Sequence, residues 1–433
     1  MNIGKPVSLN LNVRGLGHSA TLAINERCAE MQREGRLVYR LGLGQSPFPV
    51  PQNVVEALRL HAPAKDYVDV RGLRELRESV AEFHRTRQLV GATAEHVLVG
   101  PGSKELLFLL QLVFYGEIIV PSPCWVSYTP QSRIVGRTVR TLPAGFEDRW
   151  QMTPDRLLEL CEGENDHYRP RLLVLNYPAN PHGLTYSRDE LAAIAEVARR
   201  FQILLLSDEI YGELHHQGHH CSVAQFYPEG TIISSGLSKW CGAGGWRLGT
   251  FTFPAELDWL RESMAAVASE TYTAVSAPIQ HAAVVAFQGG ASIERYLAHA
   301  RRILAALGAR CHGILDGAGL RVHPPEGAFY LFADFSPHAE LLAARGIRTG
   351  RQLCAALLAE TGVAILPGND FERPAGELTA RLAYVNFDGA KAMADSESIP
   401  LDQPLPDGYL DACCGATLRA MELVAEWVAA GAR

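Results

Sequence analysis

The chain has 433 residues, of which 47% are hydrophobic and 20% charged, and its 40 basic and 47 acidic residues leave a net charge of −7. This is the composition of a globular protein with a large core, and without a basic excess it argues against nucleic acid as a partner. The nine cysteines are scattered without CxxC spacing, which indicates reduced thiols in a cytoplasmic protein. No apolar signal segment begins the chain, and polar residues and glycine interrupt its most apolar run, residues 106–120. We therefore expect neither secretion nor a membrane span.

Apolar spacing and turn residues predict the first elements of the chain. A helix over residues 19–34 is followed by a strand over 37–43, which ends at Gly44 in a glycine-containing turn. Tyr67 then lies in a loop before a charged amphipathic helix that runs to about His84. On spacing alone, Gly44 is equally well explained by an ordinary turn and Tyr67 by a half-buried loop position.

The next feature is a turn at the start of a helix. A strand over residues 96–99 leads into Gly102, Ser103 and Lys104, and an apolar helix continues from Leu106. Glycine and serine at a helix start leave backbone N–H groups free, and the helix dipole adds positive potential there. The turn therefore predicts an anion site, although a simply capped helix would have the same sequence.

Two apolar strands joined by a helix are predicted between residues 171 and 206. Such a unit makes two parallel strands, and ligands collect beyond the carboxyl ends of parallel strands. Asn180 follows the first strand, and Asp208 and Tyr211 follow the second. We therefore expect these three side chains on one rim of a sheet.

Residues 231–249 carry one lysine, Lys239, between a short apolar strand and a cluster of glycines. Where a strand and tight turns exclude water, a lysine loses hydration, its pKa falls and its amine can bond to a carbonyl carbon. Arg247 follows in the same stretch and has the planar fork that suits a phosphate. Taken alone, the stretch fits a surface lysine near a glycine-rich turn equally well.

Helices and strands are predicted over most of the remaining chain, with two polar interruptions. Residues 215–220 contain four histidines, but only Cys221 accompanies them, so we favour a solvated loop over a metal site. Residues 388–409 are polar and contain proline, which indicates an inserted surface loop. Further strands are predicted over 117–120, 171–175, 202–206, 231–233, 326–332 and 379–387. Two or more helices are predicted between 256 and 287, and single further helices over 188–201, 293–315, 350–361 and 416–430.

The lysine stretch resembles the cofactor-lysine segment of fold-type I pyridoxal-phosphate enzymes, namely the class I/II aminotransferases of the aspartate aminotransferase superfamily. The likeness lies in Ser238-Lys239 and in Gly245-Trp246-Arg247-Leu248-Gly249, and further family motifs follow in family order over nearly the whole chain. The resemblance implies an α/β fold with a mostly parallel, doubly wound sheet in a large cofactor domain, residues 50–288. A smaller α/β domain would comprise an N-terminal arm and segment, residues 1–49, and the C-terminal part, residues 289–433. The site would lie between the two domains.

The cofactor of that family is pyridoxal 5'-phosphate, and the resemblance implies a residue for each of its contacts. The implied catalytic residues are Lys239, bonded to the cofactor, Asp208 at the protonated ring nitrogen, and Tyr211, which shares the phenolic oxygen with Asn180. The other implied cofactor contacts are Gly102, Ser103, Lys104, Ser238 and Arg247 around the phosphate, Trp125 stacked on the ring, and Tyr67 from the neighbouring subunit of a homodimer. The implied substrate contacts are Gly44, Asn180 and Arg381. A structural tryptophan and an ion-paired strand arginine remain the alternatives for Trp125 and Arg381.

Two positions depart from the pattern of the family. Gly236 stands where the family often has a serine that reaches the cofactor phosphate. His182 stands where a small hydroxyl residue is usual. Ser234 and Ser238 are the candidates to supply the missing hydroxyl.

The activity that the resemblance implies is transfer of the amino group of an L-amino acid to a 2-oxo acid, with Lys239 moving the proton at the substrate Cα. A lyase or decarboxylase would keep every residue named, because the fold does not fix the outcome of the cofactor's chemistry. A transcription regulator with a silenced aminotransferase-like domain fits poorly, since only about 40 residues precede Gly44 and they are not basic. The helix after Leu106 is apolar and offers no clear cation for a distal carboxylate, which argues against a strictly aspartate-specific enzyme.

Overall fold

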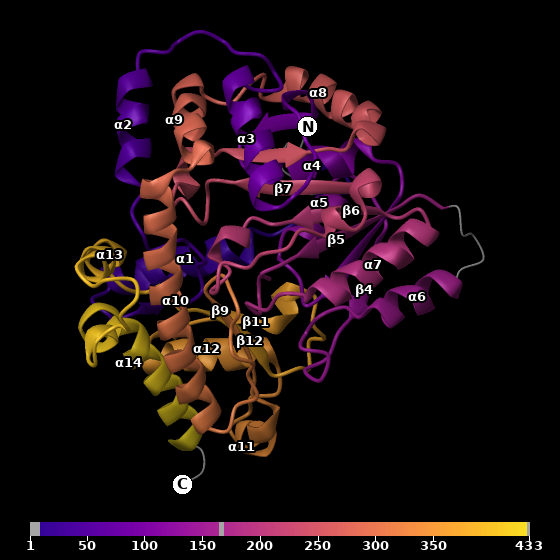
Figure 1. Cartoon of the computed structure of the whole chain (residues 1–433). Coiled ribbons are helices and arrows are strands. Elements are labelled where there is room, and N and C mark those ends of the chain that lie inside the picture. Colours follow the sequence, from indigo (N-terminus) through magenta and orange to yellow (C-terminus); the bar gives the residue numbers. More distant parts are fainter. Residues whose placement is uncertain (1–8, 164–168, 431–433) are drawn as a thin grey trace, which may run out of the picture.

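The computed structural model describes residues 9–163 and 169–430, and a sheet of seven strands lies at its centre (Figure 1). The strands are β2 (Val97–Gly100), β3 (Glu117–Ser122), β4 (Val139–Pro143), β5 (Arg171–Asn176), β6 (Leu204–Asp208), β7 (Thr231–Gly236) and β8 (Gly249–Thr252). Their order across the sheet is β2-β8-β7-β6-β5-β3-β4. Only β8 runs against its neighbours within this sheet, so the sheet is mostly parallel.

Helices cover both faces of this sheet. They are α2 (Gln52–His61), α3 (Arg74–Arg87), α4 (Ser103–Val113), α5 (Tyr128–Ile134), α6 (Pro154–Glu162), α7 (Arg188–Arg200), α8 (Asp258–Thr271) and α9 (Ala277–Gln288). Leu172 and Val174 of β5 belong to the core cluster that contains residues of α4 and α8. Leu173 and Leu175 belong to the cluster with α6 and α7 on the opposite face. Because both faces are covered, β5 has a continuous apolar sequence in place of an alternating one.

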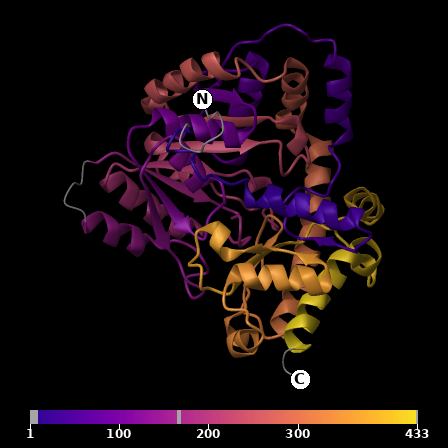
Figure 2. The same ribbon diagram turned by 180° about the vertical axis from the view of Figure 1, so that it is seen from behind.

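The N-terminal segment and the C-terminal third form a second group of elements beside the large sheet (Figure 2). They are α1 (Ala20–Arg33), β1 (Tyr39–Arg40), α10 (Ala291–Gly317), β9 (Tyr330–Asp334), α11 (Ala339–Ala344), α12 (Gly350–Thr361), β10 (Val363–Ala364), β11 (Leu366–Pro367), β12 (Thr379–Ala383), α13 (Gly389–Glu397) and α14 (Tyr409–Ala430). An antiparallel sheet has the order β11-β12-β9, and β1 pairs in parallel with β10. The long helix α10 extends from the level of α9 down to α14 (Figure 1). The domain boundaries at residues 49 and 288 stay a prediction.

The predicted surface loop over residues 388–409 is wrong, because α13 forms there. The Asp388 carboxylate accepts hydrogen bonds from two backbone N–H groups of the first turn (3.1 and 3.0 Å), which caps the helix. Met393 is buried, and α13 packs against α10 and α14. The last helix also begins earlier than predicted, at Tyr409. Tyr409 was predicted to end the preceding polar segment, although its side chain is buried.

Several strands are shorter or shifted relative to the sequence prediction. The strand predicted over 37–43 is reduced to the two residues of β1, and the one predicted over 379–387 ends at Ala383. The strand predicted over 326–332 begins only at Tyr330 and continues to Asp334. An apolar pattern marks buried chain, whereas a strand needs a neighbouring backbone to pair with. The helix predicted over 350–361 is confirmed by α12.

Two general expectations can be compared with the structure. All nine cysteines are free thiols, as expected for reduced cysteines. Among the residues that the structure describes, no helix is both long enough and apolar enough to cross a membrane.

Candidate active site

Three parallel strands end side by side at one edge of the large sheet. β5 leads to Asn180, β6 ends at Asp208 and β7 leads to Lys239. The side-chain amide of Asn176, at the end of β5, donates to the carbonyl oxygen of Asp208 (2.9 Å) and accepts from the backbone N–H of Asn180 (2.8 Å). These bonds hold the two strand ends together, so Asn180 and Asp208 share one rim, as the strand–helix–strand pattern predicts.

Lys239 reaches from the turn after β7 toward the N-terminal segment. Its Nζ donates to the carbonyl oxygen of Gly44 (2.8 Å) and lies 5.5 Å from the ring centroid of Tyr211. Burial, with a smaller contribution from the nearby Arg381 guanidinium, lowers the pKa of Lys239 to about 8. An appreciable fraction of this amine is therefore neutral, and so nucleophilic, near neutral pH.

Asp208 is a buried carboxylate with two hydroxyl donors. The Tyr128 hydroxyl donates to its Oδ2 (2.7 Å), and the Ser234 hydroxyl donates to its Oδ1 (3.3 Å). Burial raises the pKa of Asp208, while these hydrogen bonds and the backbone N–H of Ile210 act in the opposite direction. The site thus holds an acceptor whose charge is maintained by its hydrogen bonds.

The predicted anion site lies at the start of α4. Gly102 precedes the helix with φ 89°, a conformation that favours glycine, and no side chain caps the first turn. The Arg247 guanidinium donates to the carbonyl oxygens of Pro101 (3.2 Å) and Gly244 (3.0 Å), and a Cβ on Gly102 would collide with it. Free N–H groups at Ser103 and a guanidinium therefore meet at one point, which suits a phosphate.

Arg381 is fully buried on β12, with 1% of its surface exposed. Its Nη1 donates to the side-chain oxygen of Asn180 (2.9 Å), its Nη2 donates to the carbonyl oxygen of Gly42, and the Tyr330 and Phe371 rings lie 4.8 and 4.9 Å away. No carboxylate among the described residues lies within ion-pair distance of it. Burial lowers the pKa of Arg381, but a guanidinium still keeps its charge. A buried cation without an anion leaves a place for a carboxylate from outside the protein.

Tyr211 and Gly44 meet at Tyr330. The hydroxyls of Tyr211 and Tyr330 are hydrogen-bonded (2.7 Å), and burial raises the pKa of Tyr211 well above its ordinary value. Tyr211 therefore keeps its proton and remains a hydrogen-bond donor. A side chain on Gly44 would overlap the Tyr330 hydroxyl, so glycine is required there.

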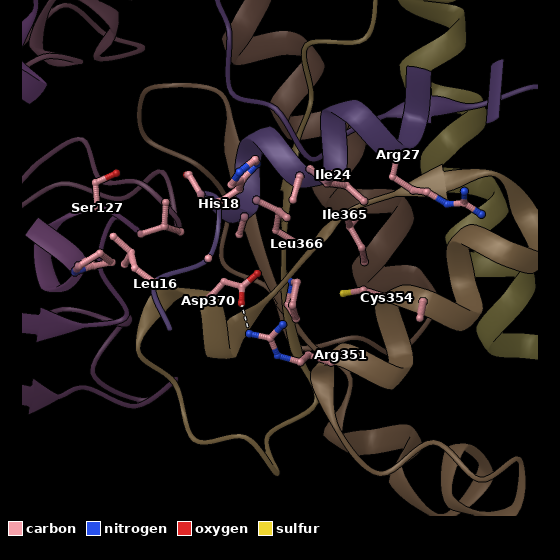
Figure 3. A pocket seen from close by; sticks show the side chains of 18 of the residues that line it. Leu16, His18, Ile24, Arg27, Ser127, Arg351, Cys354, Ile365, Leu366 and Asp370 are labelled. Carbon is pink, nitrogen blue, oxygen red and sulfur yellow. Dashed lines mark hydrogen bonds and ion pairs between the residues drawn. The ribbon is translucent and has the colours of Figure 1, made fainter. Parts of the chain in front are cut away.

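A pocket of about 1210 Å³ lies between α1, α4, α5 and α12 (Figure 3). Apolar side chains such as Ile24 and Leu366 line it, and Arg351 forms an ion pair with Asp370 on its wall (2.7 Å). Leu366 pairs with Arg381 in the sheet register, and Lys104 lines the pocket on the side of α4. The pocket therefore comes near Arg381 through Leu366, while Lys239, Asp208 and Arg381 themselves do not line it.

The Lys104 side chain is placed between the predicted phosphate turn and this pocket. Its Nζ lies 5.5 Å from the ring centroid of Trp125, which is partly buried. Burial and the charge of Arg247 lower the pKa of Lys104. No ion pair joins it to a carboxylate within residues 9–163 and 169–430, so its charge is available to a ligand.

One predicted site residue, Tyr67, is not brought into the site by a single chain. The Tyr67 side chain is 92% exposed in the loop before α3. Ser238 is partly buried next to Lys239, and the Ser234 hydroxyl is already bonded to Asp208.

The two departures from the family pattern have structural reasons. A Cβ on Gly236 would lie 2.8 Å from the carbonyl oxygen of Leu248 and 2.9 Å from the Cα of Gly249, because β8 approaches closely there. His182 is buried, its Nδ1 accepts from the Leu184 N–H (3.3 Å), and burial lowers its pKa to about 3. It is therefore a neutral ring at pH 7.

The prediction that residues 215–220 form a solvated loop is wrong for His215 and His220. His215 is 9% exposed, and the Nε2–H of His220 donates to the buried Glu209 carboxylate (2.8 Å). Within the part of the chain that the structure describes, no group of three or more His, Cys, Asp or Glu residues is placed to hold a metal ion.

Sequence reasoning missed Tyr128, Tyr330 and Asn176. Tyr128 lies three positions after Trp125, and its approach to Asp208 depends on how α5 packs behind β3 and β6. Asn176 ends an apolar strand, as Asp208 does, and the same signal could have identified it. Nothing in the local sequence marks Tyr330 as a site residue, because its hydrogen-bond partner Tyr211 is 119 residues away.

The comparisons with known proteins agree with this geometry. The family model of aminotransferase class I and II matches residues 37–385. The aspartate aminotransferase of Bacillus sp. (strain YM-2) is 32% identical over 383 residues, which are 86% of this chain and 93% of that protein. The aspartate/prephenate aminotransferase of Thermus thermophilus is 33% identical over 371 residues, 84% of this chain and 91% of that protein. The structure of the Thermus thermophilus aspartate aminotransferase with maleate superposes with a TM-score of 0.79 at 30% identity, over 90% of this chain and 98% of that one.

The doubly wound sheet, with its site at the carboxyl edge, is that of a fold-type I α/β enzyme, which confirms the predicted fold class. The relatives give no support to a lyase or decarboxylase. The chain belongs to the class I and II aminotransferase family, and it is a transaminase.

Proposed function

We propose that pyridoxal 5'-phosphate bonds to Lys239 and that the enzyme uses it to move the amino group of an L-amino acid to a 2-oxo acid. The observation that carries this proposal is the pair formed by Lys239, whose pKa is about 8, and the nearby Arg381, which has no carboxylate partner among the described residues. A neutral amine can bond to the aldehyde carbon of the cofactor. An unpaired guanidinium can bind the α-carboxylate of the amino acid through two parallel hydrogen bonds.

The residues around Lys239 fit the parts of this cofactor. The buried Asp208 carboxylate suits the ring nitrogen, and the partly buried Trp125 offers a flat ring for stacking. Ser103 and Arg247 suit the phosphate. The bound cofactor withdraws electrons from the substrate Cα, which makes the Cα proton acidic. Further contacts proposed from the sequence are Gly102, Lys104 and Ser238 near the phosphate, and Asn180 and Tyr211 at the phenolic oxygen.

The side chains of this enzyme then have separate tasks. Arg381 and the backbone at Gly44 hold the substrate carboxylate and so orient the Cα–H bond. Lys239, released from the cofactor, takes the Cα proton and returns it one step later. A pKa of about 8 suits this role because an acid–base group works best when its pKa is near the working pH.

We propose aspartate as one amino donor. Relatives at 32–33% identity are named aspartate or aspartate/prephenate aminotransferases. Lys104 supports this proposal, because it is an exposed cation that lines the pocket, lies near Trp125 and lacks a carboxylate partner in the described chain. The apolar part of α4 after Leu106, on which the expectation against a strictly aspartate-specific enzyme rested, has no cation for a distal carboxylate. Lys104, in the first turn of the same helix, is such a cation.

The apoprotein should capture pyridoxal 5'-phosphate at a rate that rises about tenfold per pH unit until pH reaches about 8 and then levels off. Only the neutral amine attacks, and burial lowers the pKa of Lys239, whereas an exposed lysine would need a pH of about 10. Absorbance at a series of pH values measures the rate, and borohydride reduction followed by peptide mapping identifies the labelled lysine. A label on an exposed residue such as Lys391 would contradict the proposal.

We also propose a homodimer in which each site takes Tyr67 from the other subunit. A tyrosine that is 92% exposed is typical of a contact surface, because its large ring and hydroxyl can be buried together there. Leu60, near the end of α2, is 75% exposed. A cytoplasmic location, suggested by the nine free thiols, is part of the same proposal.

Mixing Lys239→Ala and Tyr67→Phe subunits should restore activity through heterodimers with one intact site. The Tyr67→Phe homodimer should bind the cofactor about tenfold less tightly, because a hydrogen bond to a charged phosphate is lost. Activity and cofactor affinity are measured before and after subunit exchange. Tyr115→Phe is the matched control, since Tyr115 is also highly exposed (83%). A fully active monomer at low concentration would contradict the composite site.

A further inference from the structure

Tyr128 lies directly behind the rim of the site, in the first turn of α5. It is buried, with 1% of its surface exposed, and its hydroxyl donates to Asp208 Oδ2 (2.7 Å). Its ring meets that of Trp125 edge to face, with the centroids 5.4 Å apart. Tyr128 therefore contacts two side chains that are proposed to contact the cofactor, and it lies behind both of them as seen from the site.

The hydroxyl of Tyr128 is the closer of the two side-chain donors to Asp208. The Ser234 hydroxyl lies 3.3 Å from Oδ1, compared with 2.7 Å from the Tyr128 hydroxyl to Oδ2. Hydrogen bonds that a carboxylate accepts stabilise its charged form, and shorter ones do so more strongly. Burial raises the pKa of Tyr128, so the hydroxyl keeps the proton that it donates.

The packing of α5 against α4 fixes Tyr128 in this position. The Tyr128 carbonyl oxygen accepts from the Ser132 hydroxyl (3.1 Å), and Ser132 is also hydrogen-bonded to Gln111 of α4. The side chains of Gln111 and Gln131 are bonded as well (3.2 Å). A buried polar network of this kind limits rotation of the helix, so the donor stays aimed at Asp208.

We propose that Tyr128 is a positioning residue, whose hydroxyl keeps Asp208 charged and leaves Oδ1 as the oxygen that faces the ring nitrogen of the cofactor. This inference rests on the proposed binding of pyridoxal 5'-phosphate at Lys239. Asp208 alone would tend to take up a proton, because burial raises its pKa. A neutral Asp208 binds a protonated ring nitrogen more weakly, so the loss of the hydroxyl should affect only ligands that have this nitrogen.

The test compares two cofactors on apoprotein that carries Tyr128→Phe. The first is pyridoxal 5'-phosphate, and the second is its analogue with carbon in place of the ring nitrogen. The variant should bind pyridoxal 5'-phosphate about tenfold more weakly than the wild type, which corresponds to about one pKa unit. It should bind the carbon analogue with an affinity within about twofold of that of the wild type. The analogue has no ring nitrogen, so the loss of charge on Asp208 does not weaken its binding. Fluorescence titration gives the dissociation constants.

Two controls separate this role from packing. Tyr296→Phe removes another buried hydroxyl, one that has no hydrogen-bond partner among the described residues, and it should leave both affinities unchanged. In an Asp208→Asn background, Tyr128→Phe should no longer change the affinity for pyridoxal 5'-phosphate. This double-mutant cycle measures the coupling between Tyr128 and Asp208 even if Tyr128→Phe alone makes the protein less stable.

Each other outcome overturns the inference. Equal weakening of both cofactors would mean that Tyr128 only supports the shape of the site, and unchanged affinity for both would mean that its hydroxyl is dispensable. If wild-type apoprotein bound neither cofactor, or borohydride labelled another lysine, the proposed function itself would fail.

Discussion

Lys239→Ala should lower kcat by about 10⁴-fold, the upper end of what a positioned acid–base group contributes. The substitution removes the amine that is proposed both to bond to the cofactor and to move the proton at Cα. No other lysine among the described residues is placed to replace it: the exposed Lys104 has its Nζ 5.5 Å from the Trp125 ring centroid, and Lys65 and Lys391 pair with surface carboxylates. Steady-state kinetics with aspartate and a 2-oxo acid acceptor measure the loss.

The control for this prediction is Lys391→Ala. Lys391 is a surface lysine on α13 that pairs with Asp395 (2.6 Å), so its removal should leave kcat within about twofold of the wild type. Lys239→Ala should also keep its fold, because within the described residues the Lys239 side chain makes only the hydrogen bond to the Gly44 carbonyl oxygen. A Lys239→Ala enzyme that retains a tenth of its activity would show that the proton moves through another group.

The parts of the site that the sequence revealed are those set by strand ends. Asn180, Asp208 and Lys239 each follow an apolar strand, and the parallel order of β5, β6 and β7 alone brings them together. The strand–helix–strand pattern is enough to predict that these strands are parallel and end at the same edge of the sheet. Residues of this kind can be predicted because local sequence fixes both the strand and its end.

The parts that the sequence did not reveal depend on contacts between distant elements. Tyr128 reaches Asp208 only because α5 packs behind the sheet, and Tyr330 reaches Tyr211 only because β9 lies across the site. Gly236 is explained by the close approach of β8, which was not among the predicted strands. Apolar spacing records which face of an element is buried, but it does not record which partner buries that face.

The prediction errors at α13 and β1 also arise from contacts between distant elements. α13 has a polar sequence, and its burial comes from α10 and α14 packing on one narrow face. The strand predicted over seven positions, 37–43, pairs regularly with β10 only at Tyr39 and Arg40, and the Leu41 carbonyl oxygen beyond them accepts from the Ala383 N–H. A strand therefore ends where its neighbour ends, and sequence pattern alone does not show that limit.

Arg381→Leu should lower kcat/KM for aspartate by about 10² to 10³-fold, the usual effect of removing one partner from a buried, hydrogen-bonded charge pair. KM should rise because the α-carboxylate loses its fork, and kcat should fall because a loosened substrate misorients the Cα–H bond. Folding should survive, since Arg381 has no ion-pair partner among the described residues and leucine fits the apolar surroundings of Tyr330 and Phe371. Arg419→Leu, at an exposed site on α14, is the control and should change neither constant.

Arg381→Lys should recover only part of this loss. A lysine supplies the charge but not the two parallel N–H groups, and it cannot also reach both Asn180 and the Gly42 carbonyl oxygen, which the guanidinium spans. The decisive experiment is a single turnover without a 2-oxo acid acceptor. Wild-type enzyme should release one equivalent of 2-oxo acid per site and then stop, and both variants should release it more slowly. Continuous release of CO₂ or ammonia would contradict a carboxylate held by Arg381 throughout the reaction, because a held carboxylate stays on the substrate while the Cα proton moves.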